Sequence, residues 1–479
     1  MMVASEAHPY AKTGGLAEVV GSLSEALAGL GHAVTIVLPR YRHIATADTT
    51  AQPATVSIGW REQPVTFLTR APALGVTAVF VDVPDLYDRE FLYGTDGRDY
   101  DDNAWRFAVL SRAALEYARL RGDRPSVIHT HDWQAGLLPV YQRILLPDDP
   151  TVGTVPVLFT IHNLAFQGLF PATVVPMLGL GWDVLHVDAL EYWGQVSLLK
   201  GAINFSTMVT TVSPTYAREI LQPDLGFGFD GVLARRSRDL VGILNGIDTS
   251  RWNPAADPYV AAKYDVSRLS GKAAAKRELL EAVGLPADRR TLARPLIGLI
   301  SRLTDQKGFD LIAAAASELM SLDVTWVMLG SGEAAYEELW RNLAVRNPQT
   351  VATTIGFDER LAHLIEAGAD IFLMPSRFEP CGLNQMYSLR YGTIPIVRAT
   401  GGLEDTVRDA DDPGGGNGFK FAEYTPAALV GAVRRALAAY GNRPLWRKMQ
   451  QAGMRLDHSW DVSAREYVKV YRDAMRSRC

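Results

Sequence analysis

The sequence predicts an α/β protein built from two doubly wound parallel-sheet domains. Two patterns carry this prediction: short apolar runs rich in β-branched residues alternate with helical stretches, and the alternation occurs in both halves of the chain. The third observation is length, because 479 residues suffice for two domains of the size that α/β sheets reach. Parallel strands joined by right-handed βαβ crossovers account for this alternation.

The opening stretch "SEAHPYAKTGGLAEVVGSLSEALAGLGHAV" contains the first site candidate, where Lys12 precedes the paired Gly14 and Gly15. Adjacent glycines let the backbone turn sharply or approach something bulky. A helix start with a nearby lysine suits an anionic ligand, although a tight strand-to-helix turn with a surface lysine also fits. The helix is expected because apolar residues recur on one face. These residues are Leu16, Val19, Val20, Leu23 and Leu27.

Five further runs in the first half are expected to be buried strands, because most end in polar or glycine-containing loops. They cover residues 33–39, 76–83, 126–132, 156–163 and 208–213.

The second half repeats the theme, with helices predicted at 271–284, 308–320 and 425–440 between the strands. The predicted strands cover residues 294–303, 323–332, 350–357, 369–377 and 393–402.

The likeliest domain break lies in the Gly-, Asn-, Pro- and Trp-containing stretch 240–260. We therefore expect an N-terminal domain over 1–241 and a second domain over 242–455. A last segment, 456–479, is expected to form a helix that packs back on the N-terminal domain. Its apolar side is predicted to hold Val462, Tyr467, Val470 and Tyr471.

The composition narrows the class of protein. A formal net charge of −5 gives no support to nucleic-acid binding by bulk charge. Two cysteines, Cys381 and Cys479, cannot form a disulfide framework, which suits a reducing compartment. No apolar run approaches the roughly 20 residues of a membrane span, and the N-terminus lacks the order of a signal peptide. We expect a cytoplasmic protein with neither a membrane nor a nucleic-acid partner.

Ligands of open α/β sheets bind outside the carboxyl ends of the strands, so the residues there are the candidates. Arg302 and Lys307 flank a loop that enters a helix, an arrangement suited to a pyrophosphate, although a solvated loop would look similar. Glu379 follows another strand, where a carboxylate suits sugar hydroxyls or a developing positive charge. "ATGGLEDTV" repeats the first Thr-Gly-Gly-Leu, which indicates two sheet edges facing a shared cleft.

Metal binding is not expected. His129, His131, Asp132 and His162 end two strands, but no further ligand set with zinc-type spacing follows. A P-loop is also absent, and "GSGEAA" is too short for a dinucleotide fingerprint.

The motifs "KTGGLAEVVGSL", "HTHDWQAGLLP", "TIHNLAFQG", "TVSPTYAREI", "ILNGID", "SRLTDQKGFDL", "PSRFEPCGLNQ" and "RATGGLEDTV" occur in the order seen in bacterial glycogen synthases and plant starch synthases. The chain resembles this family over essentially its whole length. The resemblance implies the GT-B fold, with two Rossmann-like domains facing a deep cleft. It makes 1–241 the acceptor-side domain and 242–455 the nucleotide-sugar-binding domain. It also implies glucose transfer from ADP-glucose to the 4-hydroxyl of an α-1,4-glucan such as glycogen, with retained configuration and with neither metal nor cofactor.

The resemblance also implies roles for individual residues. Arg302 and Lys307 would neutralise the donor diphosphate, and Glu379 would hold hydroxyls of the donor glucose. His162 would lie beside the transferred sugar, near its 6-hydroxyl and the anomeric centre. Phe357 would stack on adenine. The backbone amides of Gly382 and Leu383 would meet the phosphates. The full set of other positions expected beside the substrate is Lys12, Gly14, Gly15, Glu18, Asp132, Asn163, Asn245, Cys381, Gly382, Leu383, Thr400 and Gly401.

Several features depart from the family pattern. Glu18 stands where the family usually has Asp, and Asn384 stands where many bacterial members carry Thr, which leaves the choice between ADP- and UDP-glucose open. No reactive role is expected for the Cys381 thiol. Relatives carry a few more residues before "MMVASE", which leaves two alternatives: a first strand weakened at its edge, or a start of the sequence that is misassigned or trimmed.

Retention is compatible with a covalent intermediate or with front-face attack through an oxocarbenium-like state. We favour front-face attack, because no carboxylate in these motifs is placed as a nucleophile. Three alternatives to the synthase remain. They are a transferase or epimerase of the same fold acting on another sugar nucleotide or acceptor, a non-catalytic glucan-binding relative, and a glucan phosphorylase, for which no pyridoxal-phosphate lysine segment is recognisable.

Overall fold

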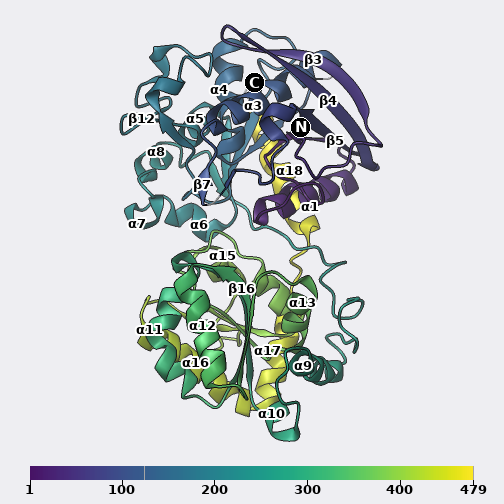
Figure 1. Ribbon diagram of the computed structural model, residues 1–479, viewed down its shortest axis with the longest axis vertical. Coiled ribbons are helices and arrows are strands. Elements are labelled where there is room, and N and C mark those ends of the chain that lie inside the picture. Colours follow the sequence, from purple (N-terminus) through teal and green to yellow (C-terminus); the bar gives the residue numbers. More distant parts are fainter. Residues whose placement is uncertain (96, 123, 478–479) are drawn as a thin grey trace. The chain divides into compact units, whose positions relative to one another are not determined.

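The computed structural model describes residues 1–95, 97–122 and 124–477, so Cys479 lies outside the described residues. The chain divides into two compact units (Figure 1). The N-terminal unit comprises Met1–Gly246 together with the chain from Trp460 onward, and the C-terminal unit comprises Ile247–Ser459. Both boundaries lie a few residues beyond those expected at 241 and 455. The boundaries differ because of backbone pairing on both sides of them. Residues 240–242 pair with β13 in the first sheet, and Ile247 N–H donates to the carbonyl of His458 at 2.8 Å within the C-terminal unit.

A nine-stranded sheet forms the centre of the N-terminal unit, in the order β14-β13-β9-β8-β1-β2-β5-β4-β3. Neighbouring strands are parallel from β14 to β5, whereas β4 and β3 are antiparallel, so this sheet is mixed at one edge. The predicted runs form β2, β5, β8, β9 and β13. The bounds are β1 Met2–Val3, β2 Val34–Pro39, β3 Thr50–Ile58, β4 Arg61–Ala73, β5 Val76–Asp82, β8 Ile128–His131, β9 Val157–Ile161, β13 Met208–Thr211 and β14 Leu240–Gly242.

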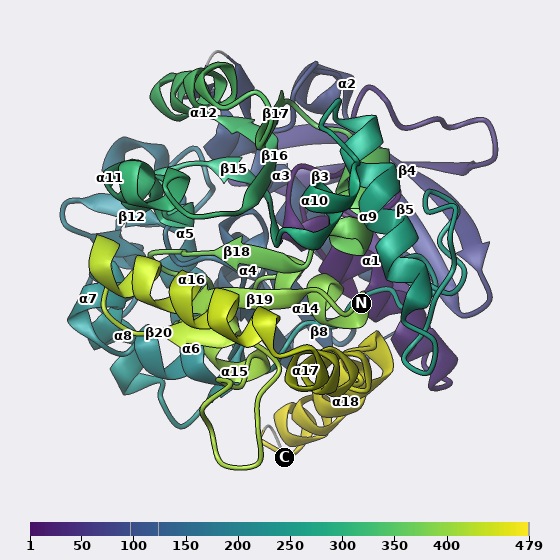
Figure 2. The same cartoon turned by 90° about the horizontal axis from the view of Figure 1, so that it is seen from below.

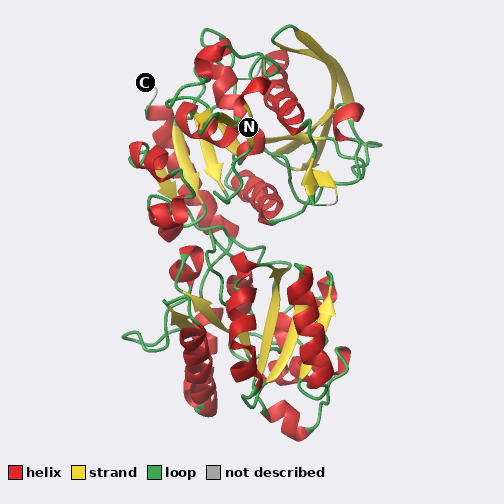
Figure 3. Ribbon diagram, turned by 60° about the vertical axis from the view of Figure 1, so that its left-hand side comes forward, coloured by secondary structure: helices red, strands yellow, loops and turns green. Residues whose placement is uncertain are grey.

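Helices flank this sheet in two groups (Figure 3). α1 packs against α18, and α3, α4 and α5 pack together in sequence. Right-handed crossovers place the two groups on opposite faces, because α1 leads toward β2 whereas α4 and α5 lead toward β13. The helices are α1 Gly15–Gly29, α2 Pro84–Tyr87, α3 Asn103–Arg121, α4 Leu137–Leu145, α5 Leu198–Phe205, α6 Pro214–Glu219, α7 Pro223–Gly226, α8 Asp230–Arg235 and α18 Trp460–Arg476. Two small sheets are formed by β6 Gly94–Thr95 with β7 Arg98–Asp99, and by β10 Leu169–Pro171, β12 Gln195–Ser197 and β11 Glu191–Tyr192.

The predicted buried face of α1 is confirmed, because its five apolar residues are all buried. The prediction for α18 is wrong at one residue. Val462 is exposed, because the buried face of α18 runs through Ser463, Tyr467 and Val470 and Val462 lies about 100° away from Ser463 around the helix.

The C-terminal unit holds a six-stranded, wholly parallel sheet in the order β17-β16-β15-β18-β19-β20, which can be followed from top to bottom in Figure 2. All five predicted strands of this half are present. The three-residue β20 was not predicted, because so short a run has no periodicity to read. The bounds are β15 Leu296–Leu303, β16 Thr325–Gly332, β17 Val351–Ile355, β18 Ile371–Met374, β19 Ile394–Arg398 and β20 Phe419–Phe421.

Two separate apolar clusters cover the two faces of this sheet, as a doubly wound fold requires. One cluster includes α11, α12, α16 and the first part of α17; the other includes α9 and α13. No helix among the described residues is long and apolar enough to span a membrane. The helices are α9 Ser270–Ala282, α10 Arg289–Ala293, α11 Phe309–Met320, α12 Ala334–Arg346, α13 Glu359–Gly368, α14 Asn384–Arg390, α15 Gly401–Thr406, α16 Pro426–Gly441 and α17 Arg443–Met454.

Candidate active site

Each unit places its predicted residues at the carboxyl edge of its own sheet. In the N-terminal unit they follow β1, β8, β9 and β14; in the C-terminal unit they lie at the ends of β15, β17, β18 and β19. We call these two groups the N-terminal half-site and the C-terminal half-site.

The Lys-Thr-Gly-Gly loop of the N-terminal half-site is fixed by Glu6, a residue that the sequence analysis did not single out. The Glu6 carboxylate is buried and accepts hydrogen bonds from Thr13 N–H at 2.5 Å and from the Thr13 hydroxyl at 2.6 Å. Tyr93 donates its hydroxyl hydrogen to the same carboxylate. The available signal was an acid placed directly after a buried strand, where a carboxylate needs local donors.

Gly14 and Gly15 are not required by the fold around them. The chain bends at Thr13 and Gly14, but Gly14 itself is extended, with φ −155°, and Gly15 begins α1, so neither conformation requires glycine. A Cβ at either position would meet nothing within 4 Å, and no side chain caps the start of α1. Lys12 is half exposed and pairs with Glu18 in the first helical turn. The positive end of α1 is therefore open space bordered by a cation.

Asp132 and His162 are joined at the ends of the neighbouring strands β8 and β9. Oδ1 of Asp132 accepts a hydrogen bond from His162 N–H at 2.8 Å. Asp132 has φ 54°, a left-handed conformation that side chains other than glycine rarely adopt. Such strain persists where the surrounding structure dictates it, often at functional sites. Burial raises the pKa of Asp132 to about 7.

His162 also lies 3.0 Å from His131, Nε2 to Nδ1, so one ring donates to the other. Burial lowers the pKa of His162 to about 3 and holds that of His131 well below its usual range. Both rings are therefore neutral at pH 7, and His162 can form hydrogen bonds without adding a positive charge. Among the described residues, no group of three His, Cys, Asp or Glu side chains could hold a metal ion.

The two asparagines of this half-site differ in their environments. Oδ1 of Asn163 accepts a hydrogen bond from Ala165 N–H at 3.0 Å, which shapes the turn after β9. Asn245 is buried beyond β14, and its Oδ1 has no hydrogen-bond partner within the described part of the chain. An unpaired buried acceptor costs free energy, so Asn245 is a candidate for binding a donor group of a ligand.

The C-terminal half-site centres on an ion pair. Lys307, at the end of the short helix η4 Asp305–Lys307, donates to Oε2 of Glu379 at 2.6 Å. Ser376 donates its hydroxyl hydrogen to the same oxygen at 3.0 Å. Glu379 is 5 % exposed, so its charge is balanced locally rather than by water. Ser376 is a further residue that the sequence analysis did not assign.

Glycines in this half-site are required by close backbone packing. Gly308 has φ 80°, and a Cβ there would collide with the carbonyl oxygen of Pro375. Gly401 has φ 47°, and its Cβ would collide with the carbonyl oxygen of Glu379. Gly402 N–H donates to that same carbonyl at 3.2 Å. The loops after β15, β18 and β19 are thus packed backbone against backbone around Glu379.

The remaining predicted residues surround this pair with different exposures. Arg302 lies within β15 near its carboxyl end and is exposed, and no described group pairs with its guanidinium. Phe357, after β17, is 87 % exposed, which is unusual for so large an apolar side chain. Cys381 and Thr400 are buried, whereas Gly382, with φ 74°, and Leu383 precede α14. The structure therefore brings Lys307, Glu379 and Gly401 together but shows no contact of Arg302 or Phe357 with them.

Two Rossmann-like units with these carboxyl-edge residues define a glycosyltransferase of the GT-B class. The family models divide the chain in the same way: residues 1–235 match the starch synthase catalytic domain, and residues 288–454 match the glycosyl transferases group 1.

The chain belongs to the glycogen and starch synthase family. A glycogen synthase of Anaeromyxobacter dehalogenans is 51% identical over 474 residues, covering 98% of each chain. One from Koribacter versatilis is 45% identical over 478 residues, covering 99% of this chain and 98% of that one. The solved catalytic domain of starch synthase IV from Arabidopsis thaliana, bound to ADP and acarbose, is 34% identical with a TM-score of 0.89 over 99% of each chain. Sucrose-phosphate synthase from Thermosynechococcus elongatus shares the fold, with a TM-score of 0.63 and 17% identity, covering 99% of this chain and 98% of that one.

The two Thr-Gly-Gly motifs should respond differently to an added methyl group. Gly15→Ala should leave the thermal midpoint within about 3 °C, since nothing occupies the space and alanine favours helix, yet it should lower turnover at least about tenfold. Gly401→Ala should lower the midpoint by about 4–8 °C, because a left-handed, sterically closed position must shift. Calorimetry alongside an assay of glucosyl transfer measures both effects. Equal losses of stability would refute the distinction.

Asp132 should give the N-terminal unit a pH-dependent stability of unusual sign. Its pKa is about 7 in the native state and ordinarily 3.8, so between these values the folded protein binds more protons than the unfolded one. Stability then falls as pH rises from about 4 to 7, by up to about 1.4 kcal/mol per pH unit.

Asp132→Asn should remove this fall in stability with rising pH. The buried His131 and His162, whose pKa values are lowered, should still make stability rise with pH in both proteins. Urea unfolding of both proteins from pH 4 to 8 provides the comparison. The difference between their curves should fall across this range and flatten above pH 7. Parallel curves would show that Asp132 titrates normally.

Proposed function

We propose that the chain is a glycogen or starch synthase that transfers glucose from ADP-glucose to the non-reducing 4-hydroxyl of an α-1,4-glucan, with retention of configuration. The observation that carries the proposal is the partly buried Lys307–Glu379 pair at the carboxyl edge of the C-terminal sheet, with the exposed cation of Arg302 near the end of β15, the strand that leads to Lys307. Support comes from the Arabidopsis starch synthase, whose solved structure holds ADP and acarbose.

The donor diphosphate would be held by Arg302 and Lys307. The leaving group of this transfer is ADP, so the transition state gains negative charge on the diphosphate, and cations there stabilise it. An unpaired carboxylate beside the diphosphate would repel it and so weaken binding of the donor. Because Glu379 is already paired with Lys307, its charge is balanced, and it remains able to accept hydrogen bonds from glucose hydroxyls. We propose that these two cations supply the charge without a metal ion.

The N-terminal half-site would act on the glucose itself. A neutral His162 can donate to or accept from the 6-hydroxyl without repelling positive charge at the anomeric carbon. Asp132 fixes the backbone of His162 and so aims the ring. Lys12 and the open start of α1 would meet the anionic part of the donor, which gives a reason for glycine at Gly14 and Gly15 that the unit itself does not supply.

The environment of Glu379 favours front-face attack over a covalent intermediate. Oε2 of Glu379 accepts hydrogen bonds from both Lys307 and Ser376, so this oxygen could form a bond to the anomeric carbon only by giving them up. These bonds hold the carboxylate in place. Glu379 is thus better suited to binding hydroxyls and stabilising an oxocarbenium-like state. A glucosyl adduct trapped on Glu379 would contradict this assignment.

The donor and the stereochemistry can be tested in one experiment. Purified protein is given glycogen with ADP-glucose or UDP-glucose, and labelled glucose incorporation is measured. We expect transfer from ADP-glucose at least about tenfold faster, a difference of roughly 1.4 kcal/mol in activation free energy. Proton NMR of the anomeric signal of a short maltooligosaccharide product should show only α-linkage. Preference for the uridine donor would refute the donor assignment, and glucan binding without transfer from either donor would refute the activity.

A further inference from the structure

Three histidine rings form a continuous column inside the N-terminal unit, and the column begins at the N-terminal half-site. His129 and His131 alternate along β8, so both side chains lie on the same face of the sheet, with ring centroids 4.0 Å apart. His131 in turn contacts His162, with 3.0 Å between Nδ1 of His131 and Nε2 of His162. The proposed glucosyl transfer uses His162 alone, which leaves the other two buried rings without a role.

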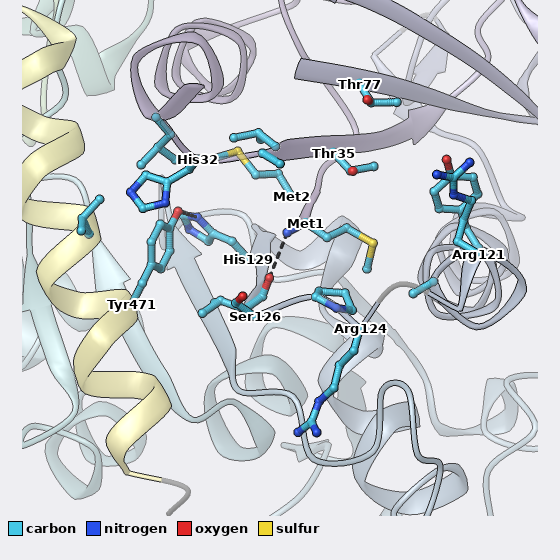
Figure 4. Close-up of a pocket in the computed structure, with 18 of the residues that line it drawn as sticks. Met1, Met2, His32, Thr35, Thr77, Arg121, Arg124, Ser126, His129 and Tyr471 are labelled. Atoms are coloured by element: carbon cyan, nitrogen blue, oxygen red, sulfur yellow. Dashed lines mark hydrogen bonds between the residues drawn. The ribbon is translucent and has the colours of Figure 1, made fainter. Parts of the chain in front are cut away.

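The far end of the column is closed by hydrogen bonds. His129 lines a cavity of about 800 Å³ at the amino ends of the central strands, where Tyr471 reaches it from α18 (Figure 4). Nδ1 of His129 lies 2.8 Å from the Tyr471 hydroxyl, and Nε2 lies 2.6 Å from the Thr160 hydroxyl. A hydroxyl can donate or accept, so both nitrogens of a neutral His129 are paired. His129 therefore supports His131 by ring packing and has no nitrogen left to bond to it.

His131 is paired at one nitrogen only. Its ring is fully buried, its Nδ1 faces His162, and its Nε2 has no hydrogen-bond partner among the described residues. A neutral imidazole has one N–H and one bare nitrogen, so a single proton lies between His131 and His162. Two arrangements satisfy this bond: either His131 donates from Nδ1, or His162 donates from Nε2.

The burial of His131 decides between these two arrangements. If His162 donated, the proton of His131 would lie on Nε2, as a buried N–H without an acceptor. If His131 donates, its Nε2 is a bare acceptor instead, and orphaned N–H donors are rarer in protein interiors than under-satisfied acceptors. Donation by His131 also places the one proton of His162 on Nδ1. His162 is only partly buried, and no described group pairs with its Nδ1, which is therefore open to a ligand.

We propose that His131 is a positioning residue that fixes the tautomer of His162, by donating from its Nδ1 to Nε2 of His162 and so keeping the His162 proton on Nδ1. The consequence for catalysis rests on the proposed function. His162 donates a hydrogen bond to the 6-hydroxyl oxygen of the donor glucose, whereas in the other tautomer its bare Nδ1 could only accept one. Asp132 holds the backbone of His162, and His131 sets the direction in which its ring acts.

The protonated nitrogen can be observed directly, without any substrate. Nitrogen-15 spectra of histidine-labelled protein distinguish a protonated from a bare ring nitrogen, and the spectrum of His162→Gln identifies the signals of His162. We expect Nδ1 of His162 to be protonated and Nε2 to be bare at pH 7. A bare Nδ1 would overturn the proposal. Because no donor is present, this result is independent of whether the chain transfers glucose.

A matched pair of variants tests the role of His131 itself. His131→Asn and His131→Leu introduce side chains of nearly the same shape, but only the asparagine amide can donate from the position of Nδ1. His131→Leu should lose the single tautomer of His162 and lower kcat/KM for ADP-glucose by about 10–100-fold, because a buried hydrogen bond is lost. His131→Asn should restore most of both. Equal behaviour of the two variants in the spectrum and in turnover would overturn the proposal.

A modified donor tests the consequence for the sugar. ADP-6-deoxyglucose lacks the 6-hydroxyl, so the loss caused by His131→Leu should shrink to within about twofold with this donor. An equal loss with both donors would show that His131 supports the site only by packing, which contradicts the proposal. If the unsubstituted protein transfers sugar from neither donor, the proposed function fails, and the nitrogen-15 spectrum still decides the tautomer.

Discussion

Backbone packing around Glu379 is the constraint on which the C-terminal half-site depends. The loops after β15 and β19 approach the loop after β18 so closely that Gly308 and Gly401 admit no side chain, and both take left-handed conformations. This packing fixes the Glu379 carboxylate beside Lys307 and Ser376. The Glu379 charge is thus compensated by two donors within tightly packed loops.

The N-terminal half-site uses the same Thr-Gly-Gly motif for another purpose. The loop that carries the motif is held by hydrogen bonds from Thr13 to the buried Glu6, while the space at Gly14 and Gly15 is left open. One motif therefore serves protein packing in one unit and access to a helix terminus in the other. His162, neutral and aimed by Asp132, supplies hydrogen bonding there without charge.

Most of the fold and the position of the site could be predicted from the sequence, because runs of β-branched residues indicate buried strands and the order of the motifs indicates the family. Every strand predicted from such a run is present, and the residues assigned to the site lie at carboxyl ends of strands. What was missed depends on contacts distant in sequence. The strands β3 and β4 carry mostly exposed residues, so they lack the apolar pattern that predicts a strand. The role of Glu6 depends on its hydrogen bonds with Thr13 and Tyr93. The exposure of Val462 depends on which face of α18 packs against the rest of the unit.

A double-mutant cycle on Lys307 and Glu379 tests the central claim most directly. Values of kcat/KM for ADP-glucose would be measured for Lys307→Ala, Glu379→Gln and the double variant, with the exposed Arg341–Glu337 pair of α12 as the matched control. If the pair works as a unit, each single change costs about 10²–10³-fold. The double variant should then lose much less than the product, a coupling above about 1 kcal/mol. Additive losses, as expected for the control pair, would contradict the account.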